Sequence, residues 1–576
     1  MQRMVDPRQT RLFDPYAPVL TATNRQWLEE HWPGVFRHVI LEWMPVDILR
    51  QHFDPDLGRP TQELYSMAGL ILLLEFHHWT QEQTVEAYRF HLEVQYALNL
   101  EPESHDLSER TLERYLAYFA QDELAQRVMH DVTTRLVTVL GLKIDQQRLD
   151  STHVFSDMAH FGRTRLLGVA LKRFLTQVQR HDPAAYEALP EALRQRYAPS
   201  ALRLFADTAR DRESQSRLRQ QVAEDLYQVL RLFAAPSAHA QRSSYQAMAQ
   251  IFQEQCEVRE EKVTLKTQAG SAVMQNPSDP DATYDGHKGP GYQVQIAETC
   301  HPDNETQLIT CALPQTAAVT DEKALVPVLE DLRASQLLPE QLLVDTLYPS
   351  DENVQQAERL GVELVGPVPG AAPAERPDDL NIDDFVVDEA TEQVTCCPDG
   401  QTPLTSVHDP ATGKTRTTMP ASACARCAYR NQCPVEEAPD DGYHLEHTAK
   451  QRRMAGRRRE QQTEVFRARY RRRSGIESTN SGLKRRTGLG RLRVRGWRRV
   501  FQALYLKITG WNILRAATCA TMRKLVQTKA RAAVFCLWAW VRTAVGARPT
   551  SRPAPSPVTG ASHGWLLPRL ALLQAA

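Results

Sequence analysis

Three acidic residues have the type and setting that metal-dependent phosphoryl chemistry requires. Asp150 and Asp345 each fall at the end of a predicted strand, and Glu477 lies in a strongly basic segment. Mg²⁺ prefers carboxylate ligands, and two such ions can clamp the attacking and leaving oxygens of a phosphodiester. A single aspartate at a strand end is more often a cap or turn residue. The prediction therefore depends on the basic segment around Glu477.

Four residues in that segment have the spacing of one helix face. Tyr470, Arg473, Glu477 and Lys484 are three, four and seven positions apart, which places them within roughly a 60° arc of an α-helix. An Arg473–Glu477 ion pair is the simpler explanation, but it accounts for only two of the four residues. We therefore expect a helix that presents one acid among cations.

The charge of the chain is unevenly distributed. Residues 451–500 hold 18 Lys and Arg against three acids, a local charge of +15, so the rest of the chain sums to -1 - 15 = -16. Such a block is typical of a site for a polyanion. A solvated arm is the alternative, but the block also contains apolar residues that such an arm does not need. They are Phe466, Tyr470, Ile476, Leu483, Leu489, Leu492 and Trp497.

The elements that would position the two aspartates alternate between strands and helices. A strand and turn begin at Lys143 and contain Asp150, and a period-two hairpin follows after residue 280. The pattern predicts an α/β fold built on a mixed sheet with flanking helices. The later elements are a hairpin of Tyr292–Cys300 and Thr306–Leu313, helices Asp321–Leu337 and Asp351–Leu360, and strands Leu342–Asp345 and Val362–Val368.

The remaining segments are expected to be mainly helical. Before residue 143 the clearest helices are Leu64–Phe76, Thr80–Leu98 and Ser108–Phe119, which could form a helix-turn-helix element or a packing domain. Residues 163–279 are predicted to be a helical insertion, and Phe501–Cys519 an apolar helix. The tail from residue 521 to 576 is expected to be largely disordered.

Five of the ten cysteines lie between residues 396 and 433. Cys397, Cys424, Cys427 and Cys433 offer the four thiolates that a tetrahedral Zn²⁺ site takes. His408 or Cys396 could replace one of these ligands, and unligated thiols are the alternative. The other cysteines are expected to be ordinary buried residues. They are Cys256, Cys300, Cys311, Cys519 and Cys536.

Composition excludes several classes of protein. Gly (26) and Pro (35) show no period, which excludes a collagen-like chain. The longest apolar stretches, Met67–Leu74 and Ala532–Val541, are too short to span a bilayer. The first 20 residues also lack the apolar region of a signal peptide. We therefore expect a cytoplasmic protein without a membrane partner.

Several ordered motifs together resemble one known family. YRRRSGIESTNSGLK, which holds Tyr470, Arg473, Glu477 and Lys484, matches the signature of bacterial insertion-sequence transposases of the DDE superfamily. LDSTHV and LLVDTLYPSDENV match the segments around the family's two aspartates, at Asp150 and Asp345. YDGHKGPGYQVQIAET, Gly58-Arg59-Pro60 and SERTLERYLAYF resemble other family segments, so the resemblance runs from about residue 10 to 520. Leu347 and Pro349 depart from the small residue and glycine that usually follow the second aspartate.

The resemblance implies an RNase H-like catalytic core and a DNA transposase, which cleaves at the ends of an insertion sequence and joins the 3'-OH ends to target DNA. Asp150, Asp345 and Glu477 would hold two Mg²⁺ or Mn²⁺ ions. Arg473 and Lys484 would bind phosphates, because Arg grips phosphate in a fork and Lys acts as a point charge.

The resemblance also implies roles outside the three acids. Tyr470 would position the DNA, and His287 and Lys288 lie in a segment these enzymes carry before the core hairpin, where Lys288 is either a phosphate contact or a surface cation. A subgroup of these enzymes carries a similar Cys-bearing insertion. The expected partner is double-stranded DNA at the element ends and target, bound by at least a dimer near the bacterial nucleoid.

The expected domains follow from these segments. Residues 1–142 would form an N-terminal helical, DNA-binding domain, and the catalytic core would comprise 143–162, 280–370 and 446–520. The insertions would be 163–279, which is helical, and 371–445, which is Cys-rich. Two other functions stay open: a catalytically inactive or host-adopted DNA-binding protein of the same fold, and an RNase H-like nuclease that only hydrolyses.

Overall fold

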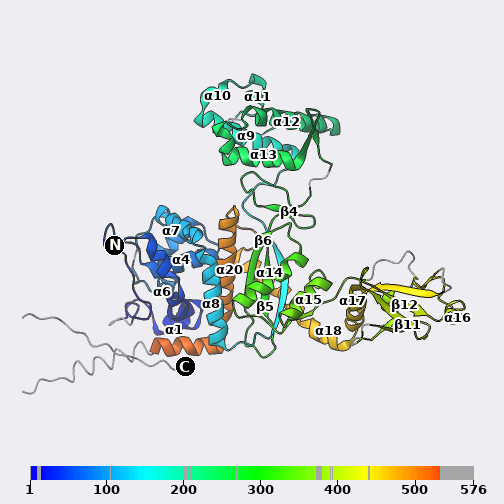
Figure 1. Ribbon diagram of the computed structural model, residues 1–576. Coiled ribbons are helices and arrows are strands. Elements are labelled where there is room, and N and C mark those ends of the chain that lie inside the picture. The colour runs from blue at the N-terminus through cyan, green and yellow to red at the C-terminus, as the bar shows by residue number, and fades with distance from the viewer. Residues whose placement is uncertain are drawn as a thin grey trace, which may run out of the picture.

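The protein is a mixed α/β molecule, as the sequence predicts (Figure 1). The computed structural model describes residues 2–9, 14–103, 105–198, 204–205, 211–267, 270–370, 379–388, 391, 393–438 and 442–531. A central sheet lies between a group of N-terminal helices on one side and a smaller β-rich region on the other, and a separate helical region extends from one end of the sheet (Figure 1). No described helix is both long and apolar enough to cross a membrane.

The central sheet is mixed, with β1 in the middle. β5 pairs antiparallel with β1 and with β6, while β7 pairs parallel with β1 and with β8. β4 pairs with the start of β5 and extends this edge. The strands are β1 (Gln146–Val154), β4 (Thr283–Asp285), β5 (Gly289–Thr299), β6 (Ile309–Thr316), β7 (Gln341–Leu343) and β8 (Glu363–Val365). Helices α14 (Asp321–Ala334) and α15 (Asp351–Arg359) connect and flank the later strands.

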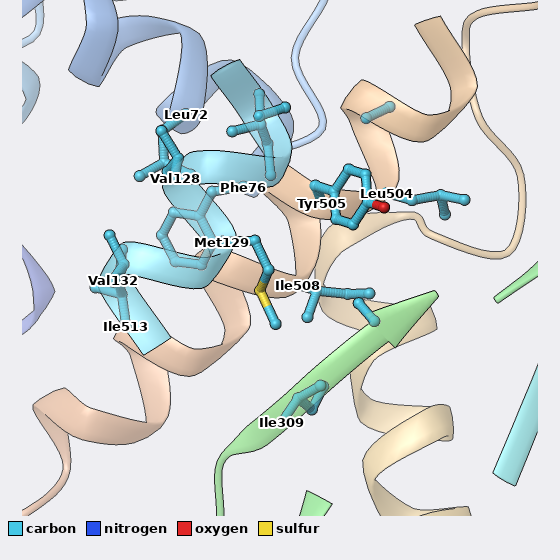
Figure 2. Close-up of a cluster of buried hydrophobic side chains, with 14 of the residues drawn as sticks. Leu72, Phe76, Val128, Met129, Val132, Ile309, Leu504, Tyr505, Ile508 and Ile513 are labelled. Atoms are coloured by element: carbon cyan, nitrogen blue, oxygen red, sulfur yellow. The ribbon is translucent and has the colours of Figure 1, made fainter. Parts of the chain in front are cut away.

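The N-terminal helices share one hydrophobic core with the sheet. Helix α20 (Trp497–Ala517) lies between them and contacts α4, α8 and β6. Figure 2 shows side chains of α4, α8, α20 and β6 meeting in this core. The expected boundary at residue 142 therefore does not separate two cores. The larger helices here are α4 (Leu64–Phe76), α5 (Gln81–Phe90), α6 (Leu92–Ala97), α7 (Glu109–Gln121) and α8 (Leu124–Leu140).

Residues 163 to 279 contain a second, separate hydrophobic core. Most of this segment is helical, as expected, but it also contains a short hairpin that the sequence analysis did not predict. The elements are α9 (Arg163–His181), α10 (Pro183–Glu187), α11 (Glu191–Arg196), α12 (Arg212–Leu232), α13 (Ser243–Gln255), β2 (Cys256–Arg259) and β3 (Lys262–Leu265).

The cysteine-bearing region is a small β structure with its own core. Four of its strands pair in the order β11-β12-β14-β13, and β9 pairs with β10. The chain leaves β14 directly into the basic helices. The elements of the β-rich region are β9 (Val386–Val387), β10 (Val394–Cys396), β11 (Thr405–Asp409), β12 (Lys414–Met419), α16 (Ala421–Cys424), β13 (Glu436–Glu437) and β14 (Tyr443–Thr448). The basic segment that follows consists of α17 (Ala449–Glu460), α18 (Glu464–Tyr470), the 3₁₀ turn η6 (Arg471–Ser474) and α19 (Gly475–Thr487).

Two predictions about helices were wrong in part. The expected helix Thr80–Leu98 is two helices, α5 and α6, because the backbone of His91 is extended. The expected disordered tail begins with helix: residues 520–531 are helical, and Met522 and Val526 are buried in the main core. The rest of the expected tail, including Cys536, lies outside the described residues.

Candidate active site

The register of two parallel strands brings the two aspartates together. The last pair between β1 and β7 is Arg148 with Leu343. Asp150 and Asp345 each lie two residues beyond that pair, and side chains two residues apart on a strand share a face. The two acids therefore project from neighbouring positions at the point where β7 ends.

Asp150 is not at the end of its strand, which corrects the sequence analysis. β1 continues to Val154 because it pairs with β5 as far as Val154 and Tyr292. Only the pairing with β7 stops early. Asp150 is thus paired with β5 on one side but has no paired strand on the side of β7.

A buried tyrosine anchors the loop after Asp345. Tyr348 is fully buried, and its hydroxyl donates to Gln295 Oε1 on β5 at 2.6 Å. Its backbone N–H also donates to the Asp345 carbonyl at 3.1 Å. Leu347, one of the two residues that depart from the family pattern, points outward and is 63% exposed. The loop is therefore held by Tyr348.

The expected single α-helix through Tyr470, Arg473, Glu477 and Lys484 is interrupted by a 3₁₀ turn. α18 ends at Tyr470, η6 follows, and α19 begins at Gly475. Gly475 has no Cβ because the guanidinium of Arg148 lies there: an added Cβ would be 2.0 Å from Arg148 Nη1. The start of α19 thus packs closely against Arg148 on β1.

The turn still brings Arg473 and Glu477 to the two aspartates. Arg473 Nη2 lies 3.2 Å from Asp150 Oδ1 and 3.4 Å from Asp345 Oδ2, and Nη1 lies 3.3 Å from Glu477 Oε1. The Arg473 side chain is only 12% exposed. Three carboxylates from β1, the loop after β7 and α19 therefore surround one cationic group.

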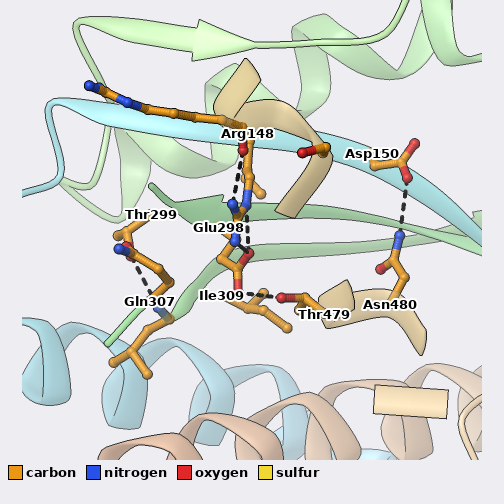
Figure 3. Close-up of polar contacts among 12 residues, drawn as sticks. Arg148, Asp150, Glu298, Thr299, Gln307, Ile309, Thr479 and Asn480 are labelled. Atoms are coloured by element: carbon orange, nitrogen blue, oxygen red, sulfur yellow. Dashed lines mark hydrogen bonds and ion pairs between the residues drawn. The ribbon is translucent and has the colours of Figure 1, made fainter. Parts of the chain in front are cut away.

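Asn480 is a site residue that the sequence analysis missed. It lies one helical turn after Glu477, and its Nδ2 donates to Asp150 Oδ2 at 3.1 Å (Figure 3). Its Oδ1 is buried without a hydrogen-bond partner among the described residues. The (i, i+3) spacing from Glu477 is the sequence signal that could have identified it. Burial raises the pKa of Asp150, against the lowering effect of Arg473.

An open groove extends from the acids along α19. It is lined by Asp150, Ser151, Thr152, Glu477, Asn480, Ser481, Lys484 and Arg485. Burial and the positive charge of Lys288 lower the pKa of Lys484. The negative charge of Asp150, in the same groove, partly offsets this lowering.

The other three residues expected to contact DNA, His287, Lys288 and Tyr470, are not among the described residues that line this groove. His287 and Lys288 are exposed in the turn between β4 and β5, where both backbone N–H groups donate to Asp285 Oδ1. Tyr470 is half-buried, and its ring stacks on Phe466. Burial raises the pKa of Tyr470, whose hydroxyl is therefore neutral at neutral pH.

Four cysteine side chains line one pocket in the β-rich region. They are Cys397, Cys424, Cys427 and Cys433. Burial and the three neighbouring thiols raise the pKa of Cys424 to about 11. Neither His408 nor Cys396 is among the described residues that line this pocket.

Neither group forms a complete metal site as it stands. Among the described residues, no three His, Cys, Asp or Glu side chains are arranged closely enough to share an ion. At the acids, the guanidinium of Arg473 lies between the carboxylates. The other described cysteines, Cys256, Cys300, Cys311 and Cys519, are buried, as expected.

A family model described as "Transposase DDE domain" matches residues 396–517. The matched segment contains the four cysteines of the pocket, Glu477 and helix α20, but it contains neither Asp150 nor Asp345. No curated protein and no solved structure matches the chain.

Proposed function

The chain belongs to the DDE superfamily of transposases through the domain at residues 396–517, and from this premise we propose that it cleaves DNA at the ends of a mobile element and joins those ends to target DNA. The observation that carries the proposal is the convergence of Asp150, Asp345 and Glu477 on one cation from three separate elements. The mixed sheet with β1 at its centre supports an RNase H-like core.

The chemistry of these residues would suit a pair of Mg²⁺ or Mn²⁺ ions once Arg473 leaves the carboxylates and the acids move closer together. The three acids offer hard oxygen donors, and they already surround a positive group. The unpartnered Oδ1 of Asn480 is a further oxygen beside them. Two bound ions would supply an activated water and stabilise negative charge on the phosphodiester.

The protein's own side chains would bind and orient the DNA. Arg473 would leave the carboxylates and turn to a phosphate, where its fork can make two hydrogen bonds. Lys484 would hold a second phosphate in the groove, and Lys288 would extend the same path from the turn before β5. Tyr470 would pack against the DNA backbone from beside β8.

Further parts of the chain would serve assembly. We infer that the N-terminal helices bind DNA and that at least two copies hold the two element ends together. We also infer that the four cysteines bind a structural Zn²⁺, because the β-rich region has only a small core and a metal would add to it.

Cleavage of labelled DNA that carries the element's own ends tests the proposal. Wild-type protein should cut at the element boundary when Mg²⁺ is present, and Glu477→Gln should not, because it removes one ligand charge while nearly keeping the shape. Binding without cleavage in both proteins would favour the second candidate, a DNA-binding protein of this fold.

A substrate assay separates the third candidate. An RNase H-like nuclease would hydrolyse the ends but would not join the freed 3'-OH to a second DNA. Joined products that depend on Glu477 would therefore exclude a purely hydrolytic enzyme.

A further inference from the structure

One buried carboxylate connects the elements that carry the first and third acids. Glu298 on β5 is fully buried. Its Oε2 accepts hydrogen bonds from Arg148 on β1, and its Oε1 accepts one from the Thr479 hydroxyl on α19 at 2.8 Å (Figure 3). Arg515 on α20 donates to the same Oε1 at 3.0 Å. The carboxylate of Glu298 thus receives hydrogen bonds from three elements.

The partners of Glu298 lie two residues from the acids. Arg148 precedes Asp150 by two positions on β1, and Thr479 follows Glu477 by two positions on α19. Arg148 Nη1 also donates to the Arg472 carbonyl at 3.0 Å, immediately before Arg473. Any shift of Glu298 would therefore be transmitted to both sides of the candidate active site.

Stability alone is a weak reason to bury these charges. Burying an ion pair costs desolvation that its attraction often does not recover, and well-packed apolar side chains in its place are often as stable. Four hydrogen bonds with fixed directions nevertheless define a separation between β1 and α19 more narrowly than apolar contacts do. The network is therefore suited to fixing a geometry.

We propose that Glu298, with Arg148 and Thr479, is a positioning group that sets the distance between Asp150 and Glu477 for metal binding. The inference rests on the proposed function, because it concerns the same site. The Asn480–Asp150 hydrogen bond is a second connection between the same two elements, closer to the acids. Loss of the network would leave all three acids present but too far apart or misdirected.

The first test replaces one hydroxyl. Thr479→Val keeps the shape but removes the donor to Glu298, and Thr487→Val is its matched control. Thr487 is also buried on α19, but its hydroxyl donates to the Leu483 carbonyl of its own helix. Mn²⁺ binding to each folded protein is measured without DNA, from the free Mn²⁺ signal in electron paramagnetic resonance.

Thr479→Val should need roughly tenfold more Mn²⁺ for half-saturation, because the geometry of the acids would no longer be held. Thr487→Val should keep the Mn²⁺ affinity of the wild type, even if its unfolding temperature falls as much as that of Thr479→Val. Equal Mn²⁺ affinities in the two variants would overturn the inference.

A second pair of variants perturbs the same geometry through the backbone. Gly475→Ala would push a methyl group into the Arg148 guanidinium, whereas a Cβ at Gly456 on α17 would meet nothing within 4 Å. The first variant should weaken Mn²⁺ binding roughly tenfold or more, and the second should not. Wild-type binding by Gly475→Ala would contradict the proposal.

The outcome for Glu477→Gln keeps the two proposals apart. If that variant binds Mn²⁺ as tightly as the wild type, Glu477 is not a ligand, and both the three-acid site of the proposed function and this inference fail. If it loses Mn²⁺ while Thr479→Val and Gly475→Ala bind normally, only the positioning role is excluded.

Discussion

Arg473 neutralises a site that would otherwise repel itself. Three carboxylates gather around its guanidinium, two of them substantially exposed and Asp150 less so. Without a cation, the mutual repulsion of these groups would favour their separation. Under the proposed function, Arg473 would pair with the acids before divalent ions bind and with a phosphate afterwards.

This exchange predicts a stability change that depends on metal. Arg473→Gln should lower the free energy of unfolding by about 1 kcal/mol without divalent ions, a modest loss because two of the acids are solvated. Mg²⁺ should then raise the unfolding temperature of the variant more than that of the wild type, because no guanidinium competes. Thermal unfolding with and without Mg²⁺ measures both effects.

The control for this experiment is the exposed residue Arg471, two positions earlier. Arg471→Gln removes the same charge and should respond to Mg²⁺ as the wild type does. An equal response of all three proteins would show that Arg473 does not compete with metal.

Lys484 predicts a change in the salt dependence of DNA binding. Lys484→Gln should reduce the slope of log affinity against log salt concentration by about one, because one phosphate contact is lost. Lys262 is an exposed residue on β3, in the helical insertion and outside the groove. Lys262→Gln removes the same charge there and should keep the slope. Fluorescence anisotropy across a salt series measures the slopes, and an unchanged slope for Lys484→Gln would contradict the phosphate contact.

Elements with a purely local signal were predictable from the sequence. Helix Leu64–Phe76 has the predicted bounds, because the apolar stretch Met67–Leu74 follows soon after a capping residue, Glu63. The hairpin of β5 and β6 was predictable from its period-two pattern and turn. In each case the deciding residues are neighbours in sequence.

Features decided by distant residues were not predictable. The close contact of Gly475 with the guanidinium of Arg148 joins residues more than 300 positions apart. The continuation of β1 past Asp150 depends on pairing with β5. The acids themselves were identified by motif, whereas Asn480 became apparent only through its hydrogen bond to Asp150.

The folding of the β-rich region should depend on the Zn²⁺ ion proposed for its four cysteines. Cys427→Ser should abolish binding of one Zn²⁺ per chain and expose the amides of β11 to β14 to hydrogen exchange, because this region has a separate small core. The central sheet should stay protected. Zinc content and hydrogen exchange measure these outcomes.

Cys396→Ser is the matched control, since Cys396 adjoins Cys397 but is not among the residues lining the pocket. It should keep the zinc and the protection. Equal zinc content in wild type and Cys427→Ser would contradict the zinc site.

At the scale of the whole molecule, buried neutral histidines should limit stability in mild acid. Burial lowers the pKa of His447 to about 4 and that of His77 to about 4. Below pH 6.5 the unfolded chain gains protons that the folded chain does not, so stability is complete above that pH and falls toward pH 4.

His447 is 2% exposed, and it should account for about 1 kcal/mol of the loss at pH 5.5. Urea unfolding at pH 7.5 and 5.5 measures this loss. His447→Gln should show a smaller loss than the wild type; the same loss in both proteins would exclude His447 as a source.

The position of α20 also constrains how the protein matures during synthesis. Its partners α4 and α8 are finished by residue 140, but α20 begins only at Trp497. At the usual rate of translation, α4 and α8 would be synthesised about 20 to 70 seconds before α20, the helix that packs on them. Glu477 and α20 are also made almost together, so a nascent chain would gain its last acid only as its core closes. Chaperones would have their longest access to this protein before its three candidate acids are all present.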